Sequence, residues 1–214
     1  AAFLETGGTV VGVERYQSAQ SDYGDTIQRA LLLDKSEARH ARMTHALGRN
    51  IVFEARRRAD VDAVFAPGFP RALRALRPQL KYFHAGRLPV YATSHAWNGS
   101  VNPGSDLDLN GVRFPVMPWS LSPSSTDEAL QKQISRAGGS SKRGAFYALG
   151  ADALRLLPIL ADRESGFPWV FPGSTGKLQL GTAGILKRDL LWADFIKGRP
   201  SLVAADSAAV APKR

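Results

Sequence analysis

Residues 173–177 (GSTGK) place two glycines and a lysine much as a phosphate-binding loop does. That loop needs four residues between the glycines and a Ser or Thr directly after the lysine. Here only Ser174 and Thr175 separate the glycines, and Leu178 follows the lysine. The pattern around the segment also indicates a strand after it rather than a helix. A β-turn is therefore the favoured interpretation, and the sequence predicts no nucleotide cofactor.

Residues 106–111 (DLDLNG) match the opening of a calcium-binding loop. The twelfth position of such a loop should be a bidentate glutamate, but it is Met117. A turn that leads into a strand at Val112 is the favoured interpretation. His40 and His45 lie on different faces of an expected helix, with no carboxylate at a ligand spacing. The sequence therefore predicts no metal site.

Ser94 and His95 invite a nucleophilic mechanism, because a serine and a base are the core of many hydrolases. Adjacent residues on an extended chain point apart, so His95 cannot act as the base for Ser94. The sequence also has no Gly-x-Ser-x-Gly elbow. We therefore predict that the chain is not an enzyme and that both residues line a cleft or contact a partner.

Polar and aromatic residues follow two apolar runs of the chain. Thr93, Ser94 and His95 directly follow the run at residues 88–92, and Pro118 and Trp119 directly follow the run at residues 112–117. In an open α/β sheet, ligands bind outside the carboxyl ends of the strands, so the two ends are expected to face one crevice. The residues predicted to line the cleft or contact a partner are Tyr91, Ser94, His95, Trp119 and Tyr147.

Composition narrows the class of protein. The chain has 214 residues, 44% of them hydrophobic and 22% charged, which is typical of a globular protein with a sizeable core. It has no cysteine, so disulfides and thiolate metal sites are excluded. No apolar run approaches the roughly 20 residues that span a bilayer.

The net charge of +9 favours an acidic partner or surface, but the charges are scattered. The densest cluster is Arg56–Arg58, and Arg71–Lys81 adds cations at helical spacing, which we interpret as a solvated helix face. No aromatic residues are interleaved with these cations as a base-stacking surface requires. Nucleic acid is therefore not a predicted partner.

The order of expected elements indicates a parallel sheet. Strands are expected at 9–16, 61–66, 88–92 and 112–117, and helices at 25–33, 36–47, 71–80, 124–133 and 143–162. Alternating strands and helices are typical of βαβ units, and the continuously apolar runs favour strands covered on both faces. Ser36 is an expected helix cap, and either Ser124 or Ser125 is expected to cap the helix at 124–133. Pro158 is expected to end or kink the last helix, and residues 173–187 are expected to form a hairpin.

Several segments in the same order resemble one family of bacterial proteins. These segments are DVDAVF (60–65), LRPQLKYFHAGRLPVYATSH (76–95), LNGVRFPVMPW (109–119), AFYALGADALRLL (145–157), and PGSTGKLQL with GILKRDLLWADFIKG (172–198). The chain resembles the C-terminal domain of LppC/LpoA-type outer-membrane lipoproteins over nearly its whole length.

The resemblance implies an α/β, periplasmic-binding-protein-like type I fold, with helices on both faces of a parallel sheet and an incomplete second lobe. Residues 1–110 would form an essentially complete α/β lobe, 111–184 part of a second lobe, and 185–214 a return segment and tail. The opening AAFLETGG reads as the end of a helix, so we expect the chain to be part of a longer protein.

The resemblance also implies a function. It implies a lipid anchor upstream, the periplasmic side of the outer membrane, and activation of a class A penicillin-binding protein by protein–protein contact, which supports peptidoglycan synthesis and cell shape. Peptidoglycan itself is a further expected partner. The alternative is a periplasmic module that binds an amino acid, a peptide or a cell-wall fragment in its cleft.

Overall fold

Two β-sheets organise the computed structural model, which describes residues 2–140, 143–161, 169–181 and 184–204. The strands are β1 (Val64–Phe65), β2 (Val90–Tyr91), β3 (Val112–Val116), β4 (Trp169–Pro172), β5 (Lys177–Leu180), β6 (Leu186–Asp189), β7 (Leu191–Ile196) and β8 (Arg199–Leu202). The α-helices are α1 (Ala2–Glu5), α2 (Gly24–Leu31), α3 (Leu33–Leu47), α4 (Pro70–Leu80), α5 (Pro103–Asp106), α6 (Pro118–Leu121), α7 (Ser125–Arg136) and α8 (Gly144–Ala161). The other helical turns are η1 (Lys81–Ala85), η2 (Ser94–Ala96) and η3 (Leu107–Leu109).

The first sheet confirms the predicted α/β class. Its order is β1-β2-β3-β7-β8. Strands β1, β2 and β3 are parallel, β7 pairs antiparallel with β3, and β8 pairs antiparallel with β7. Helix α4 connects β1 to β2, and α5 and η3 lie between β2 and β3, as a βαβ arrangement requires. We call this sheet with its helices the first lobe. The strands β1 and β2 are shorter than the apolar runs that predicted them.

The core of the first lobe lies between α4 and one face of this sheet. Leu73 and Leu76 of α4 are buried there with Phe114 of β3 and Phe195 of β7, whose ring centroids are 5.0 Å apart. Burial alternates along β3, where Arg113 is only half-buried. This alternation differs from the continuous burial expected of the strand runs, because a charged residue is placed on the second face.

The cations predicted to form a solvated helix face divide into two pairs, because Arg71 and Lys81 are exposed whereas Arg74 is half-buried and Arg77 is buried. Arg74 pairs with the buried carboxylate of Asp106 at 2.6 Å. Arg77 is buried and donates to the carbonyls of Gly86 and Asn110. Desolvation lowers the pKa of Arg77, and its Nη1 has no hydrogen-bond partner among the described residues. These two arginines therefore hold the α4–β3 connection instead of facing water.

The prediction of a buried strand at residues 9–16 is wrong. This segment has no regular structure, and Val13 is 78% exposed. Side chains hold it in place: Arg58 donates to the carbonyl of Val11 at 2.8 Å, Arg29 pairs with Glu14 at 3.3 Å, and the hydroxyl of Tyr16 donates to the carbonyl of Pro67. β-Branched residues favour a strand only where a neighbouring strand satisfies their backbone groups, and none of the described strands pairs with this segment.

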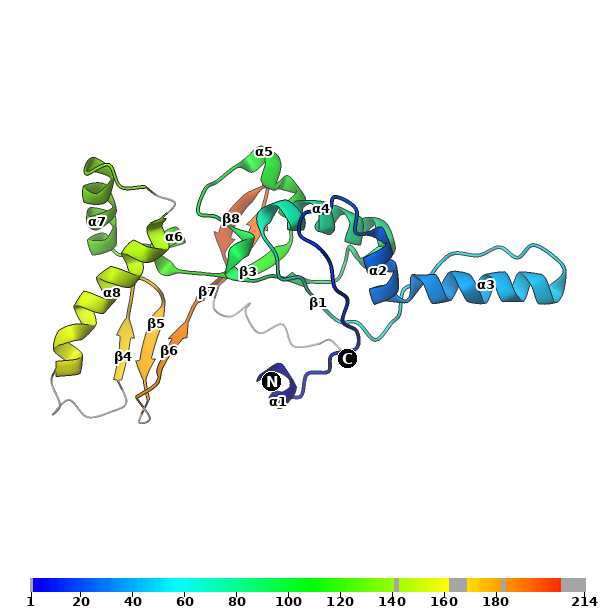
Figure 1. Cartoon of the computed structure of the whole chain (residues 1–214), viewed down its shortest axis with the longest axis horizontal. Helices are drawn as coiled ribbons and strands as arrows, with labels where there is room; N and C mark the ends of the chain where they lie inside the picture. The colour runs from blue at the N-terminus through cyan, green and yellow to red at the C-terminus, as the bar shows by residue number, and fades with distance from the viewer. Residues whose placement is uncertain (1, 141–142, 162–168, 182–183, 205–214) are drawn as a thin grey trace.

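Helix α3 projects from the first lobe as an arm (Figure 1). Leu32, in the left-handed conformation at φ 57°, ends α2 and starts α3 in a new direction. Gly48, at φ 62°, ends α3 as the sequence predicted. Ser36 does not cap the helix, because α3 already begins at Leu33; its hydroxyl instead accepts a hydrogen bond from the amide of Arg56.

The second sheet belongs to a second lobe that also contains α6, α7 and α8 (Figure 1). Its strands are antiparallel in the order β4-β5-β6, so the predicted hairpin is confirmed. Ser124 caps α7, as predicted, by accepting a hydrogen bond from Asp127. Pro158 lies inside α8 and does not end it. Only Leu190 separates β6 from β7, so this strand pair leads directly back to the first lobe.

Candidate functional site

The predicted contact residues fall into two groups, one in each lobe. Tyr91 ends β2, and Ser94 and His95 begin the η2 turn that follows it. Trp119 lies in α6 and Tyr147 in α8, both in the second lobe. The two groups therefore sit on separate lobes, and each is considered by its own contacts.

Tyr91 belongs to a row of side chains on the half-open face of the first sheet. It pairs in register with Arg113, which pairs in turn with Asp194, so the three side chains share one face. Asp194 binds Arg113 through two contacts of 2.8 Å, and this hydrogen bonding raises the pKa of Arg113. The ring of Tyr91 meets Trp192 edge-on at 6.1 Å. A neutralised ion pair on the same face as two aromatic rings suits protein contact better than ion binding.

His95 lies against an aromatic ring rather than beside a catalytic partner. Its imidazole meets Phe69 edge-on, with centroids 5.4 Å apart. His95 and Phe69 are both exposed. Ser94 lies at the start of the same short turn. The structure thus places Ser94 and His95 after the carboxyl end of β2, as the sequence predicted, and leaves both side chains exposed.

Trp119 lies inside the second lobe and is only 6% exposed. Its amide donates to the carbonyl of Ser174 at 3.0 Å, and its carbonyl accepts from Gln131 at 2.8 Å. A Cβ on Gly144 would lie 3.0 Å from the indole nitrogen, so α8 packs directly on this ring. Trp119 therefore joins α6, α7, α8 and the β4–β5 turn, and its ring offers little surface to a partner. Tyr147 is half-buried on α8.

Sequence reasoning missed a buried polar network beneath the β4–β5 turn. Asp152 accepts hydrogen bonds from the amides of Ser174 and Thr175 at 2.7 and 2.8 Å, and from the hydroxyl of Thr175 at 2.7 Å. Asp127 accepts from the hydroxyl of Ser174 at 2.7 Å and from Arg155 at 2.8 Å. The i, i+3 spacing of Asp152 and Arg155 on an apolar helix was the one available sequence signal.

The hydrogen bonds of this network determine whether the GSTGK segment can bind a phosphate. The segment forms the turn between β4 and β5, as predicted, with the amide of Gly173 bonded to the carbonyl of Gly176 at 2.9 Å. The amides of Ser174 and Thr175, which a phosphate loop would offer to its ligand, are already donated to Asp152. A Cβ on Gly173 would lie 2.7 Å from the same carboxylate. The turn is therefore closed around a protein carboxylate.

The charge balance at Asp127 follows from these contacts. Burial pushes the pKa of Asp127 upward, and this is the largest single influence on it. Hydrogen bonds from Ser174, Arg155 and Ser124 together outweigh burial, so the pKa of Asp127 is lowered overall. The carboxylate is therefore held ionised as a structural anchor.

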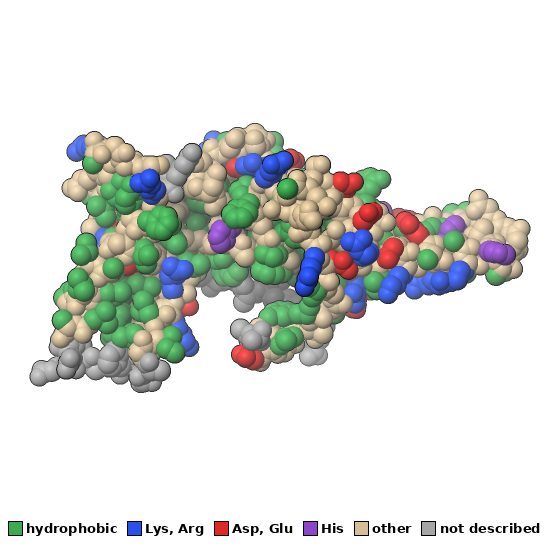
Figure 2. All heavy atoms as spheres, in the orientation of Figure 1, with side chains coloured by type: hydrophobic (Ala, Val, Ile, Leu, Met, Phe, Trp, Pro, Cys, Tyr) green, Lys and Arg blue, Asp and Glu red, His purple; other side chains and the backbone are tan. Residues whose placement is uncertain are grey.

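Helix α8 exposes an apolar face on the second lobe. The helix buries Ala148, Ala151, Asp152 and Leu156 and leaves the larger residues outside. The exposed residues are Phe146, Leu149, Leu154, Leu157 and Leu160. Hydrophobic side chains gather over this lobe in Figure 2. By length and composition α8 could cross a membrane, although the buried carboxylate of Asp152 and its partners place it in the lobe.

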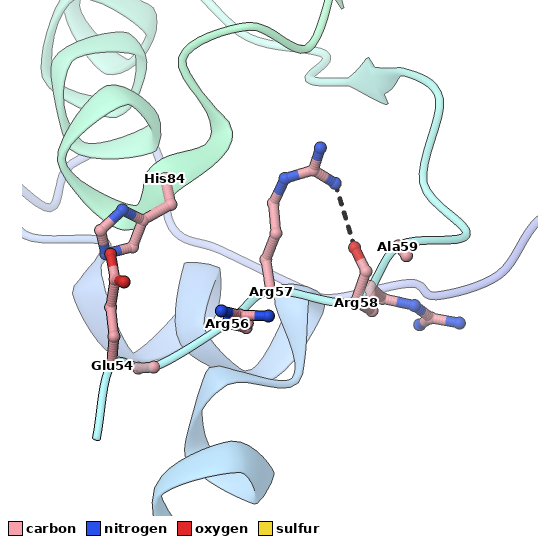
Figure 3. Close-up of a pocket in the computed structure, with 7 residues that line it drawn as sticks. Glu54, Arg56, Arg57, Arg58, Ala59 and His84 are labelled. Atoms are coloured by element: carbon pink, nitrogen blue, oxygen red, sulfur yellow. Dashed lines mark hydrogen bonds between the residues drawn. The ribbon is translucent and has the colours of Figure 1, made fainter. Parts of the chain in front are cut away.

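An open basic hollow lies at the root of the α3 arm, away from both groups. It has a volume of about 280 Å³ and is lined by residues 54–59 and by His84 (Figure 3). It contains the arginine cluster Arg56–Arg58. The cluster lies on a segment without regular secondary structure, outside the helices that the sequence predicted.

Comparisons with a family model and with curated proteins identify the same family. The model of the LppC lipoprotein family matches residues 2–198. "Penicillin-binding protein activator LpoA" of Edwardsiella ictaluri (strain 93-146) is 27% identical over 141 residues, which is 64% of this chain and 20% of that protein. The same-named protein of Vibrio cholerae serotype O1 (strain ATCC 39541) is 25% identical over 163 residues, 76% of this chain and 27% of that protein. The chain thus spans about a fifth to a quarter of these curated relatives.

Solved structures share the fold. The structure described as "LpoA (YraM) C-domain from Haemophilus influenzae, a regulator of PBP1A" matches with a TM-score of 0.57 and 23% identity, covering 79% of this chain and 57% of that chain. The leucine-binding protein LivK of Thermotoga maritima matches with a TM-score of 0.50 and 15% identity, over 96% of this chain and 55% of that one. These likenesses confirm the periplasmic-binding-protein-like fold.

Proposed function

Because the chain belongs to the LppC lipoprotein family, we propose that it forms part of a non-enzymatic regulator of peptidoglycan synthesis. The regulator activates a class A penicillin-binding protein by protein–protein contact. The observation that carries this proposal is the similarity to proteins named penicillin-binding protein activator, at 27% identity over 141 residues. A related C-domain structure described as a regulator of PBP1A supports the same assignment.

The place of action follows from the family. A lipoprotein that activates a cell-wall synthase works at the periplasmic side of the outer membrane, held by its lipid. The described residues include two surfaces suited to protein contact. One is the aromatic row of Tyr91 and Trp192 with exposed Ser94 and His95, and the other is the apolar face of α8. Trp119 contributes by joining elements of the second lobe beneath α8, and Tyr147 lies half-buried on α8 itself.

The first surface has the composition of an interface. Tyrosine, tryptophan and arginine are enriched at protein interfaces, and Tyr91, Trp192 and Arg113 occur together there. The α8 face supplies the apolar area instead, and contiguous exposed apolar area marks interaction sites. Neither surface depends on the scattered positive charge, so we expect the contact to persist at high salt.

The test is the affinity of this chain for the periplasmic region of a class A penicillin-binding protein, measured by biolayer interferometry at 50 and 500 mM salt. We expect saturable binding that changes less than fivefold between the two salt concentrations. A Leu157→Asp variant should weaken binding at least tenfold if the apolar face of α8 is the contact. His95→Ala should weaken binding at least tenfold if the contact is the other surface, which includes Tyr91, Trp192 and His95. Val13→Asp, at an exposed apolar position outside both surfaces, is the control. Absence of binding by the unaltered chain overturns the proposal that these residues carry the contact.

A further inference from the structure

The basic hollow at the root of the arm contains positive charge that forms no ion pair with the residues that the structure describes. The five arginines in ion pairs are Arg29, Arg58, Arg74, Arg113 and Arg155. Arg58 lines the hollow but turns away to Asp60, which it contacts twice at 2.6 Å. Arg56 and Arg57 form no ion pair among the described residues. Arg57 donates only to the carbonyl of Arg58, at 3.0 Å.

The backbone of the hollow also offers donors. The amides of Arg56 and Arg58 donate to Ser36 and Leu31, on the side of α2 and α3. Successive amides of an extended chain point to opposite sides, so those of Ala55 and Arg57 are expected to point away from these helices. Within the described part of the chain these two amides donate no hydrogen bond.

His84 enters the hollow from a strained backbone. Its φ of 61° is in the left-handed region, which residues other than glycine, asparagine and aspartate rarely adopt. Such strain is concentrated at binding sites, where the surrounding structure holds it. In the view of Figure 3, His84 and Glu54 lie to the left of Arg57 among the residues that line the hollow. Glu54 supplies the acidic charge of the hollow, so the part lined by Arg56 and Arg57 is the electropositive part.

We propose that this hollow binds the terminal oxyanion of a small ligand, a carboxylate or a phosphate, with Arg56 and Arg57 as its charged contacts. Arginine presents a planar fork of donors that fits both groups. His84 and the free amides complete the set of donors, while Glu54 favours ligands that also carry a hydroxyl or ammonium group. The proposal is independent of the activator function, because no synthase takes part in the binding.

The test is a titration of the ¹⁵N-labelled chain, followed by two-dimensional NMR, with N-acetylglycine as the carboxylate probe and inorganic phosphate as the phosphate probe. We expect saturable shifts at residues 54–59 and His84 with at least one probe, and the probe that saturates first identifies the preferred oxyanion. N-acetylglycinamide, the uncharged counterpart, should cause no shift there. Equal shifts with the amide, or no saturation with either anion, would overturn the proposal.

Variants locate the contacts. Arg57→Gln and Arg56→Gln should each weaken binding at least tenfold, and their unchanged resonances elsewhere would show that the fold is intact. Arg143→Gln removes the same charge from an exposed position in the second lobe and should stay within twofold of the unaltered chain. His84→Asn keeps a residue that tolerates left-handed φ and should weaken binding about threefold. Unchanged affinity in both arginine variants would remove the hollow as the site.

Discussion

The two lobes are stabilised in different ways. The first lobe buries a continuous apolar cluster, with Leu73, Phe114 and Phe195 at its centre. The second lobe buries a polar network of Asp127, Asp152 and their partners and leaves the larger apolar residues of α8 outside. The first sheet therefore has a core typical of a domain, whereas the second lobe has a polar anchor and an open apolar face.

The two kinds of core constrain the shapes of the two lobes to different degrees. Apolar burial is non-directional, so the first lobe tolerates many sequences of similar volume. A buried carboxylate network requires specific partners at specific distances, so it fixes the shape of the second lobe more narrowly. The lobe that presents the open face is thus the one whose geometry is determined by directional bonds.

The largest expected effect is in the first lobe. Phe114→Ala removes a ring that is 0% exposed and lies 5.0 Å from Phe195. The free energy of unfolding should fall by about 4 kcal/mol, because the cavity adds to the lost transfer energy. Urea denaturation followed by circular dichroism measures it. Phe146→Ala, at a position 74% exposed on α8, should change stability by less than about 0.5 kcal/mol. Equal losses in the two variants would contradict the contrast between the lobes.

The second effect is confined to the second lobe. Asp152→Ala leaves the amides of Ser174 and Thr175 without their acceptor, at a site that is 2% exposed. We expect a loss of about 3 kcal/mol, because breaking a buried network strands the remaining donors. Hydrogen exchange should accelerate in β4 and β5 and stay unchanged in β3. Asp189→Ala, an exposed carboxylate on β6, is the control. Uniform acceleration in both lobes would show that they unfold as one unit.

Acid should also affect the second lobe selectively. The pKa of Asp127 is lowered, so its contribution to stability is present above the unfolded-state pKa of about 3.9. The contribution disappears as the pH falls through the lower folded-state pKa. Below about pH 4, hydrogen exchange in α7 and the β4–β5 turn should therefore rise. Asp127→Asn should remove most of this pH dependence. An acid profile identical in the variant would mean that another group is responsible.

Local pattern predicted much of this architecture. Periodicity and caps placed α4, α7 and α8 within a few residues. Gly48 was correctly predicted as a helix end, and Ser124 is the cap among the two serines that the sequence offered. These features succeed because caps and periodicity are determined by residues close in sequence. The reading of the GSTGK segment as a turn depended on loop spacing, which is local as well.

Features that depend on distant partners were not predictable. Residues 9–16 have strand composition but no neighbouring strand among those described, so their conformation differs from the expectation. The predicted contact Trp119 is buried because Gly144, twenty-five positions later, packs on its ring. The network of Asp127, Asp152 and Ser174 joins residues up to 47 positions apart. Sequence spacing gives no measure of such distances.

The smallest effect tests whether local capping matters to the polar anchor. Ser124 accepts the amide hydrogen of Asp127 at 3.2 Å, and its hydrogen bonding also lowers the pKa of that carboxyl group. Ser124→Ala should therefore cost about 1 kcal/mol of unfolding free energy, the usual value for a lost N-cap. Ser135→Ala, on an exposed position inside α7, should be neutral or slightly stabilising, because alanine has the higher helix propensity. If Ser124→Ala and Asp127→Asn together cost less than the sum of their separate effects, cap and anchor act as one coupled unit. Strict additivity would show that the cap stabilises α7 independently of the network beneath it.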